Sequence, residues 1–226
     1  MAYPCWLCDA ELLPTHTTAV CSFCGQAAPA EYICPNGHFI CEECQLADLP
    51  AAVERVCAGT ADTDPGRIAN LVMKHPLMLM HSPQHHVLVA PVVLAALANA
   101  GLYPLKEGRL AAAIERTADI PVAVCGKRGE CGAAASGGAL VAILTGASYR
   151  KDRERSLVLQ ATAETLLAIA AAGGPRCCKQ SVYLALETAG AFLRRELGLN
   201  LPLTVRCEFS RRNEECKKER CRFYEP

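Results

Sequence analysis

The sequence predicts a mainly α-helical protein, with a helical-bundle domain that ends in a short strand and a small zinc-binding module in front of it. Apolar residues make up 51% of the 226 residues, but aromatic residues only 5%. The core must therefore be built mostly from Ala, Leu and Val, which suits packed helices. The N-terminal segment differs because its cysteines recur in C-x2-C pairs, which are typical of zinc ligands.

Charge divides the chain at nearly the same place as the cysteine pattern. Residues 1–54 contain seven acidic residues and no Lys or Arg. All 23 basic residues lie in 55–226 with the other 16 acidic residues, which gives that part a net charge of +7. The length is enough for one sizeable domain and a small module. We therefore expect a double zinc-binding module at 1–48 and an α-helical, Cys/His-rich domain at 49–226.

The fifteen cysteines bear on the compartment as well as on metal binding. The chain has no uncharged apolar run of 18 residues, and it begins M-A-Y-P-C-W, without a basic region or an apolar signal core. We therefore expect a cytoplasmic protein that does not enter a membrane. In a reducing compartment so many cysteines indicate metal-binding thiolates rather than disulfides, and an anaerobic cell would fit this composition.

Eight residues of the module have the spacing of two zinc sites, because two tetrahedral ions need eight N/S ligands. The run C-P-N-G-H-F-I-C-E-E-C resembles the middle of a RING finger, with an earlier C-x2-C in place of its usual final pair. That resemblance implies a cross-brace, whereas sequential pairing, or a zinc-ribbon module, is the alternative. The cross-brace ligands are Cys21, Cys24, Cys41 and Cys44 on one zinc ion, and Cys5, Cys8, Cys34 and His38 on the other.

The module is not expected to bind nucleic acid. It has no Lys or Arg to neutralise phosphate, and its seven acidic residues and seven cysteines carry the opposite charge. A structural or protein-contacting role is the better interpretation. For the whole chain we expect a protein partner or a small-molecule substrate, with a homodimer as a further possibility.

Capping residues and apolar spacing predict seven helices in the second domain. Asp64 followed by Pro65 suits one helix start. Ser82 followed by Pro83 suits another, with Pro91 bending that helix. The expected helices span 49–59, 65–74, 83–101, 107–117, 131–146, 153–172 and 175–197, and the expected C-terminal strand lies in 203–210.

Histidines gather in one short part of this domain. Four of the six lie within twelve residues, at His75, His81, His85 and His86. His81 and His85 can converge at a helix start, so we assign His81, His85 and His86 as candidate catalytic residues for proton transfer, metal binding or substrate contact. Helix capping and surface exposure are the alternative interpretation.

The stretch G-G-P-R-C-C-K-Q places Cys177 and Cys178 at a helix start, between Arg176 and Lys179. Free backbone N–H groups, the helix dipole and the two cations predict lowered thiol pKa values there. Neighbouring side chains on a helix diverge by about 100°, so at most one of the two thiols faces a shared site. We assign Cys177, Arg176 and Lys179 to cofactor binding and Cys178 to catalysis.

Five further cysteines complete the candidate cofactor site. Cys125 lies in a Gly-rich loop and Cys131 begins a helix whose first turns hold three glycines, which indicates close approach to another helix or to a ligand. The C-terminal tail carries Cys207, Cys216 and Cys221 among seven basic residues. These three predict a ligand or redox role, with a solvated basic tail as the alternative.

Together, several motifs resemble an uncharacterised family, domain of unknown function 5714. They are H-S-P-Q-H-H-V-L-V, C-G-K-R-G-E-C-G-A-A, T-G-A-S, G-G-P-R-C-C-K and C-E-F-S-R-R-N followed by the last two cysteines. The resemblance covers roughly 70–226 and implies a family found mainly in anaerobes and archaea, sometimes joined to methyltransferase domains. A weaker resemblance links the order of cysteines to putative redox proteins with a C-G-C-A-x-x-G-C-C pattern. Neither family implies a settled reaction.

The leading hypothesis is a metal-dependent redox or sulfur-handling protein with two structural zinc ions. An iron–sulfur cluster is expected on Cys125, Cys131, and Cys177 or Cys178, with a possible ligand from the C-terminal trio. One alternative is an all-zinc adaptor whose C-terminal cysteines form a third zinc site. Another is a cluster-free dithiol reductase that uses Cys177 with Cys125 or Cys131.

Overall fold

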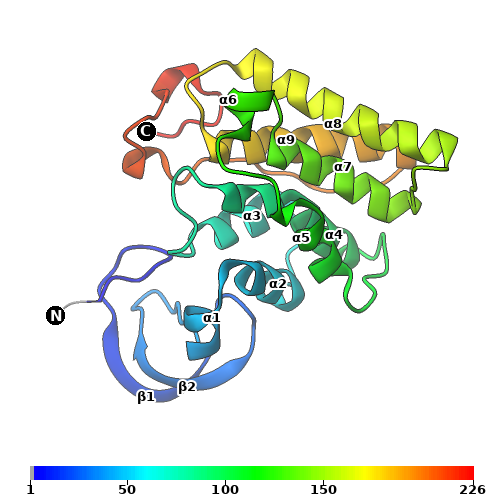
Figure 1. Ribbon diagram of the computed structural model, residues 1–226. Helices are drawn as coiled ribbons and strands as arrows, with labels where there is room; N and C mark the ends of the chain where they lie inside the picture. Colours follow the sequence, from blue (N-terminus) through cyan, green and yellow to red (C-terminus); the bar gives the residue numbers. More distant parts are fainter. Residues whose placement is uncertain (1–2) are drawn as a thin grey trace.

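The computed structural model describes residues 3–226, and it is mainly helical with one small sheet (Figure 1). The α-helices are α1 (Glu42–Leu46), α2 (Leu49–Gly59), α3 (Pro65–Met73), α4 (Val89–Asn99), α5 (Arg109–Ala118), α6 (Val124–Arg128), α7 (Gly132–Thr145), α8 (Asp152–Ala172) and α9 (Cys178–Phe192). The strands are β1 (Leu13–Val20) and β2 (Ala27–Ile33). Short 3₁₀ turns lie at Pro83–Val87, Ser210–Arg212 and Lys218–Arg220, and a π turn at Leu193–Leu197. The predicted fold class is confirmed.

The N-terminal module consists of the antiparallel β1–β2 hairpin followed by α1. The strands pair from Leu13 with Ile33 to Val20 with Ala27, and a bulge interrupts the register between Pro14 and Thr17. Most of the hairpin is exposed, and the buried residues of the module are chiefly its cysteines and Phe23. The module therefore has little apolar core of its own apart from the residues around its cysteines.

The helical domain is built around α4, which is buried on every side from Val89 to Leu97. Helices α7, α8 and α9 lie side by side in the upper part of Figure 1, and α5 and α7 pack against α4. A Cβ on Gly138 would lie 2.1 Å from Thr162 Oγ1, so this glycine lets α7 approach α8 closely. That contact is helix packing, one of the two roles predicted for the α7 glycines.

Two helix predictions need correction. Instead of one bent helix over 83–101, Pro83–Val87 forms a 3₁₀ turn and α4 begins at Val89. Pro91 then falls in the first turn of α4, where its missing N–H costs no helical hydrogen bond and causes no bend. The last long helix begins at Cys178 with Cys177 as its N-cap, so Pro175 precedes the helix rather than opening it.

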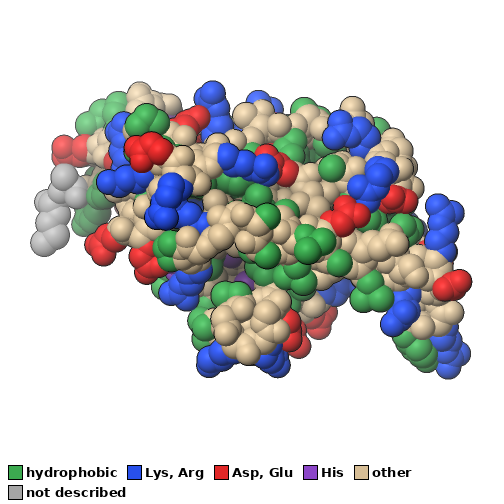
Figure 2. All heavy atoms as spheres, turned by 90° about the horizontal axis from the view of Figure 1, so that it is seen from above, with side chains coloured by type: hydrophobic (Ala, Val, Ile, Leu, Met, Phe, Trp, Pro, Cys, Tyr) green, Lys and Arg blue, Asp and Glu red, His purple; other side chains and the backbone are tan. Residues whose placement is uncertain are grey.

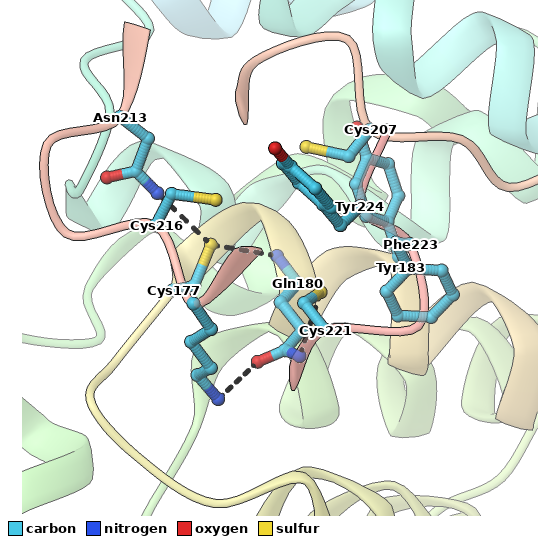
Figure 3. Close-up of a pocket in the computed structure, with 10 residues that line it drawn as sticks. Cys177, Gln180, Tyr183, Cys207, Asn213, Cys216, Cys221, Phe223 and Tyr224 are labelled. Atoms are coloured by element: carbon cyan, nitrogen blue, oxygen red, sulfur yellow. Dashed lines mark hydrogen bonds between the residues drawn. The ribbon is translucent and has the colours of Figure 1, made fainter. Parts of the chain in front are cut away.

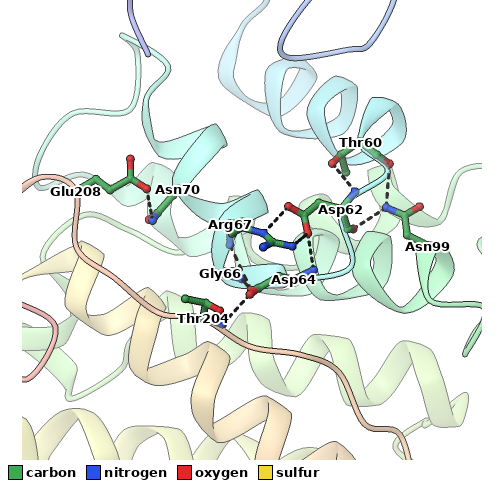
Figure 4. Close-up of polar contacts among 9 residues, drawn as sticks. All are labelled: Thr60, Asp62, Asp64, Gly66, Arg67, Asn70, Asn99, Thr204 and Glu208. Carbon is green, nitrogen blue, oxygen red and sulfur yellow. Dashed lines mark hydrogen bonds and ion pairs between the residues drawn. The ribbon is translucent and has the colours of Figure 1, made fainter. Parts of the chain in front are cut away.

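The C-terminal strand predicted within 203–210 is wrong. This segment forms no strand among the described residues. Side chains of the α3 region bind two of its backbone groups (Figure 4), and Cys207 N donates to the Phe223 carbonyl at 3.1 Å. Thr204 N donates to Asp64 Oδ2 at 2.8 Å, and Asn70 Nδ2 donates to the Arg206 carbonyl at 3.0 Å. The segment is therefore fixed along α3 without joining a sheet.

Candidate metal centres and the adjoining cavity

The module brings its eight predicted ligands together as two compact sets of four. In each set the four ligand atoms lie within 4.8 Å of one another. A Zn–S bond of about 2.3 Å puts the sulfurs of one tetrahedral site about 3.8 Å apart, so each set fits a single zinc ion. The sets are Cys5, Cys8, Cys34 and His38, and Cys21, Cys24, Cys41 and Cys44, which is the cross-brace arrangement rather than sequential pairing.

N–H groups point at the sulfurs of both sets. Leu7 N donates to Cys5 Sγ and Asn36 N donates to Cys34 Sγ, each at 3.4 Å and each from two residues further along the chain. The Asn36 side-chain amide also donates to Cys8 Sγ and lowers the pKa of that thiol to about 6. Such N–H···S bonds stabilise thiolate, the form in which cysteine binds a metal.

A second group of cysteines surrounds a pocket at the start of α9. We call it the four-thiol pocket, because Cys177 and the three C-terminal cysteines, Cys207, Cys216 and Cys221, all line it. Figure 3 shows their side chains with Gln180, Asn213, Tyr183, Phe223 and Tyr224 around the same space. The C-terminal trio and Cys177 were both predicted cofactor residues, but their convergence on one pocket was not predicted.

Three of the four sulfurs in the four-thiol pocket accept a hydrogen bond from an N–H group. Gln180 N donates to Cys177 Sγ at 3.4 Å, and Gln180 Nε2 donates to Cys221 Sγ at 3.2 Å. Lys218 N donates to Cys216 Sγ at 3.4 Å, again from two residues further along the chain. At Cys207 burial raises the pKa and the amide of Phe209, likewise two residues on, opposes that rise. Cys216 thus repeats the two-residue turn seen at Cys5 and Cys34 of the module, whereas Gln180 supplies the donors to both Cys177 and Cys221.

Two buried lysines lie beside this pocket. Lys179 is 1% exposed and Lys217 is 7% exposed, and neither forms an ion pair with a carboxylate in the described part of the chain. Lys217 Nζ donates to Gln180 Oε1 at 2.7 Å, while Lys179 Nζ lies 4.3 Å from the Phe209 ring centre. Burial lowers the pKa of Lys179 to about 8, and the nearby Cys177 and Cys207 sulfurs oppose that fall. Lys217 Nζ also donates to the Ala172 and Gly173 carbonyls, so its ammonium has oxygen partners. Lys179 Nζ lies 3.3 Å from His85 Nε2, and the sulfurs of Cys177 and Cys207 are its candidate anionic partners.

The predicted lowering of the thiol pKa values at the start of α9 is wrong. Burial raises the pKa of both Cys177 and Cys178, and it outweighs the backbone amides and the nearby cations. Desolvation disfavours the charged form of a thiol, and a bound metal is what would offset it.

The remaining predicted cysteines line a separate, larger cavity next to the four-thiol pocket. It encloses about 280 Å³. Cys125, Cys131 and Cys178 line it together with His85, His86 and Arg176, and Cys177 belongs to both spaces. Figure 2 shows a hollow with histidine at its floor on the face seen from above. The structure therefore brings Cys125, Cys131, Cys177 and Cys178 to one cavity, but not to one compact metal site.

The four clustered histidines separate in the structure. His85 and His86 line the cavity, whereas His81 Nε2 lies 3.2 Å from Asn213 Oδ1 on the C-terminal side. His75 instead packs on the module, with its Nε2 3.2 Å from the Cys44 carbonyl. Burial lowers the pKa of His85 to about 3, so its ring is neutral at physiological pH.

His85 and His86 have defined partners. His85 Nδ1 lies 3.1 Å from the Ser82 carbonyl, and its Nε2 lies 3.3 Å from Lys179 Nζ. His86 Nδ1 lies 3.2 Å from the Ile120 carbonyl. Nδ1 of both rings therefore serves as the donor, and Nε2 of His85 accepts from Lys179.

Gln180, Asn213 and Lys217 also belong to this site, and none of them was predicted from the sequence. Gln180 follows the C-C pair closely enough to have been considered as a donor to its sulfur. No local pattern marks the other two, whose partners in this site lie from 36 to 132 residues away along the chain.

The family comparison matches most of the helical domain. The model of a family of unknown function, DUF5714, matches residues 53–224. The chain belongs to the DUF5714 family. The match begins just inside α2, after both zinc-type sites, and it includes the four-thiol pocket and the cavity. No curated protein and no solved structure matches the chain. In the described part, no helix is both long and apolar enough to cross a bilayer.

Proposed function

We propose that this DUF5714 protein is a redox or sulfur-handling protein that carries an iron–sulfur cluster in the four-thiol pocket and two structural zinc ions in the module. The cluster ligands are Cys177, Cys207, Cys216 and Cys221. Among the cysteines first expected to hold the cluster, Cys177 remains a ligand, and the C-terminal trio, from which one ligand was expected, supplies the other three. Cys125, Cys131 and Cys178 become cavity residues beside it.

The spacing of the sulfurs supports a cluster over a third zinc ion. The four sulfurs of this pocket do not all lie within 4.8 Å of one another, although the ligands of both module sites do. A single zinc ion needs sulfurs about 3.8 Å apart. A cluster presents a separate iron to each thiolate and so accepts ligands that are further apart.

Charge and hydrogen bonding also support an iron–sulfur cluster in the four-thiol pocket. Four thiolates on a cluster leave a net negative charge, which Lys179 and Lys217 can offset from buried positions. N–H donors to the sulfurs stabilise the more negative, reduced state. Phe223 and Tyr183 wall the pocket, and their rings lie 5.4 Å apart and limit access of water.

When bound, the cluster supplies one-electron transfer or sulfur chemistry next to the cavity. The chain's own residues hold the ligand geometry, offset the charge and present Cys178, Cys131 and the two cavity histidines to a bound molecule. Since Cys177 lines both spaces, a molecule in the cavity would lie directly beside a cluster ligand.

Anaerobic purification followed by metal analysis tests the proposal. We expect absorbance near about 400 nm, matching iron and acid-labile sulfide, and two zinc ions per chain. Cys216→Ser should lose most of the iron and keep both zinc ions, whereas the matched variant Cys125→Ser should keep iron and zinc. A colourless protein with a third zinc ion would overturn the cluster, and iron loss in Cys125→Ser alone would overturn the ligand set.

A further inference from the structure

The cavity beside the four-thiol pocket has one cationic end and one apolar wall. Arg176 and the first residues of α9 form the cationic end, and the charge of Arg176 acts on the Cys178 thiol. Val122, Val124 and Ile169 contribute to the apolar wall. Among the described residues that line the cavity, none is acidic. The lining therefore offers a cationic side chain to an anion and no carboxylate to a cation.

Two long helices begin at this cavity, and side-chain caps bind few of the free backbone N–H groups of their first turns. The 14-residue helix α7 has Cys131 as its N-cap, and the Cys131 side chain makes no capping bond. In α9, the Cys177 side chain caps only the amide of Gln180. Ala133 and Cys178 in these first turns line the cavity. The partial positive charges of both helix starts therefore add to that of Arg176 at the same end.

We propose that this cavity binds a small organic carboxylate, with the carboxylate at Arg176 and the α7 and α9 starts and the carbon chain against Val122, Val124 and Ile169. This inference depends on the proposed function at one point only, namely that the carboxylate is the substrate of the redox or sulfur-handling reaction. Its binding does not require the cluster. Cys178 and Cys131 then lie against the bound molecule and are its contact thiols.

Size and wall chemistry select this ligand class. A volume of about 280 Å³ is just below the roughly 300–1,000 Å³ that is usual for ligand pockets, so the ligand is small. The guanidinium of an arginine matches a carboxylate with two parallel hydrogen bonds. An inorganic anion would leave the aliphatic wall against water, whereas a short carbon chain covers it.

Alkylation with two reagents that differ in charge tests the inference without knowledge of the natural ligand. Iodoacetate and iodoacetamide differ in charge but place the same reactive carbon on a thiol. We would measure both alkylation rates at Cys178, Cys131 and Cys125 by peptide mass spectrometry. For each thiol, the rate with iodoacetate is divided by the rate with iodoacetamide, in the folded and in the urea-unfolded chain. The ratio cancels the intrinsic reactivity of each thiol. At Cys178 or Cys131 it should rise about tenfold on folding, as expected for a cleft that concentrates an anion.

Arg176 provides the matched variants. Arg176→Ala should remove most of the rise, whereas Arg176→Lys should keep part of it because the charge stays. Trifluoroacetate provides a second test of carboxylate binding, which does not depend on whether the thiols react with either reagent. Its fluorine resonance should broaden with the wild-type chain and with Cys216→Ser, which lacks the cluster, but not with Arg176→Ala. Sulfate should displace trifluoroacetate less well than propionate does.

A ratio that does not rise on folding, together with an unbroadened trifluoroacetate line, would overturn the inference. A rise that survives Arg176→Ala would overturn the assigned carboxylate position. If Cys216→Ser loses iron but still broadens the line, both proposals stand. If the wild-type chain holds no iron and yet shows the anion effect, the cluster fails and the carboxylate site stands.

Discussion

At the scale of single residues, Asp64 does more for the fold than its place in a loop suggests. It is 1% exposed, and its Oδ1 accepts hydrogen bonds from Gly66 N and Arg67 N at the start of α3. Its Oδ2 accepts from Thr204 N, which lies 140 residues further along the chain (Figure 4). One carboxylate thus caps a helix and anchors the segment that carries Cys207.

Asp64→Ala should therefore cost more than the loss of a simple cap. We expect the free energy of unfolding to fall by about 2–4 kcal/mol, since charge-assisted hydrogen bonds on both oxygens are lost and the buried N–H groups are left unpaired. Asp48→Ala is the control, because exposed Asp48 caps α2 with a single bond to Ala51 N at 2.9 Å. It should cost about 1 kcal/mol in urea unfolding followed by circular dichroism. Equal losses in the two variants would contradict this role of Asp64.

At the scale of elements, the module meets the helical domain through a backbone contact. A Cβ on Gly59, the last residue of α2, would lie 2.1 Å from the Cys24 carbonyl oxygen. Only glycine lets α2 come this close to the loop that carries Cys21 and Cys24. The zinc-type site and α2 are therefore held together by shape as well as by apolar contact.

Gly59→Ala should separate the module from α2 without removing metal. We expect a loss of about 1–3 kcal/mol, since backbone must move to relieve the clash, while zinc analysis still gives two ions per chain. Gly190→Ala in α9 is the matched control, because its nearest neighbour, Leu203 Cδ2, would lie at an ordinary 3.7 Å. That variant should be neutral or stabilise by up to about 1 kcal/mol in thermal unfolding. If both variants behave alike, the close approach is not what limits docking.

The elements also show what sequence can and cannot predict. Caps are local, so Asp64–Pro65 marked the start of α3. C-x2-C spacing marked six of the module ligands, and the C-x3-H run added Cys34 and His38. The cross-brace stayed one of two alternatives until the hairpin brought Cys5 and Cys34 together. The four-thiol pocket depends on a segment held to α3 by Asp64 and Asn70, and no short-range pattern encodes such a contact. The same contacts explain why a β-like sequence at 203–210 stays unpaired.

At the scale of the whole molecule, one apolar core crosses the division expected at residue 48. Phe23 and Phe39 of the module belong to the same buried cluster as Val53 of α2 and Val92 of α4. The single tryptophan, Trp6, lies at this junction, with ring centres 6.4 Å from Phe23 and 5.5 Å from His75. Trp6 thus reports on whether the two parts remain packed together.

We expect zinc removal to uncouple the parts. In the zinc-loaded chain, Trp6 fluorescence and helical circular dichroism should change in one thermal transition, because a shared core unfolds cooperatively. After chelation, Trp6 emission should shift to the red before heating, since metal binding supplies most of the folding free energy of a module with so little core. The helices should persist, with a lower melting temperature. Cys216→Ser serves as the background for this measurement, because it should lack the iron that would quench fluorescence and absorb light. Unchanged Trp6 emission after complete zinc removal would show that the module holds its place through apolar packing alone.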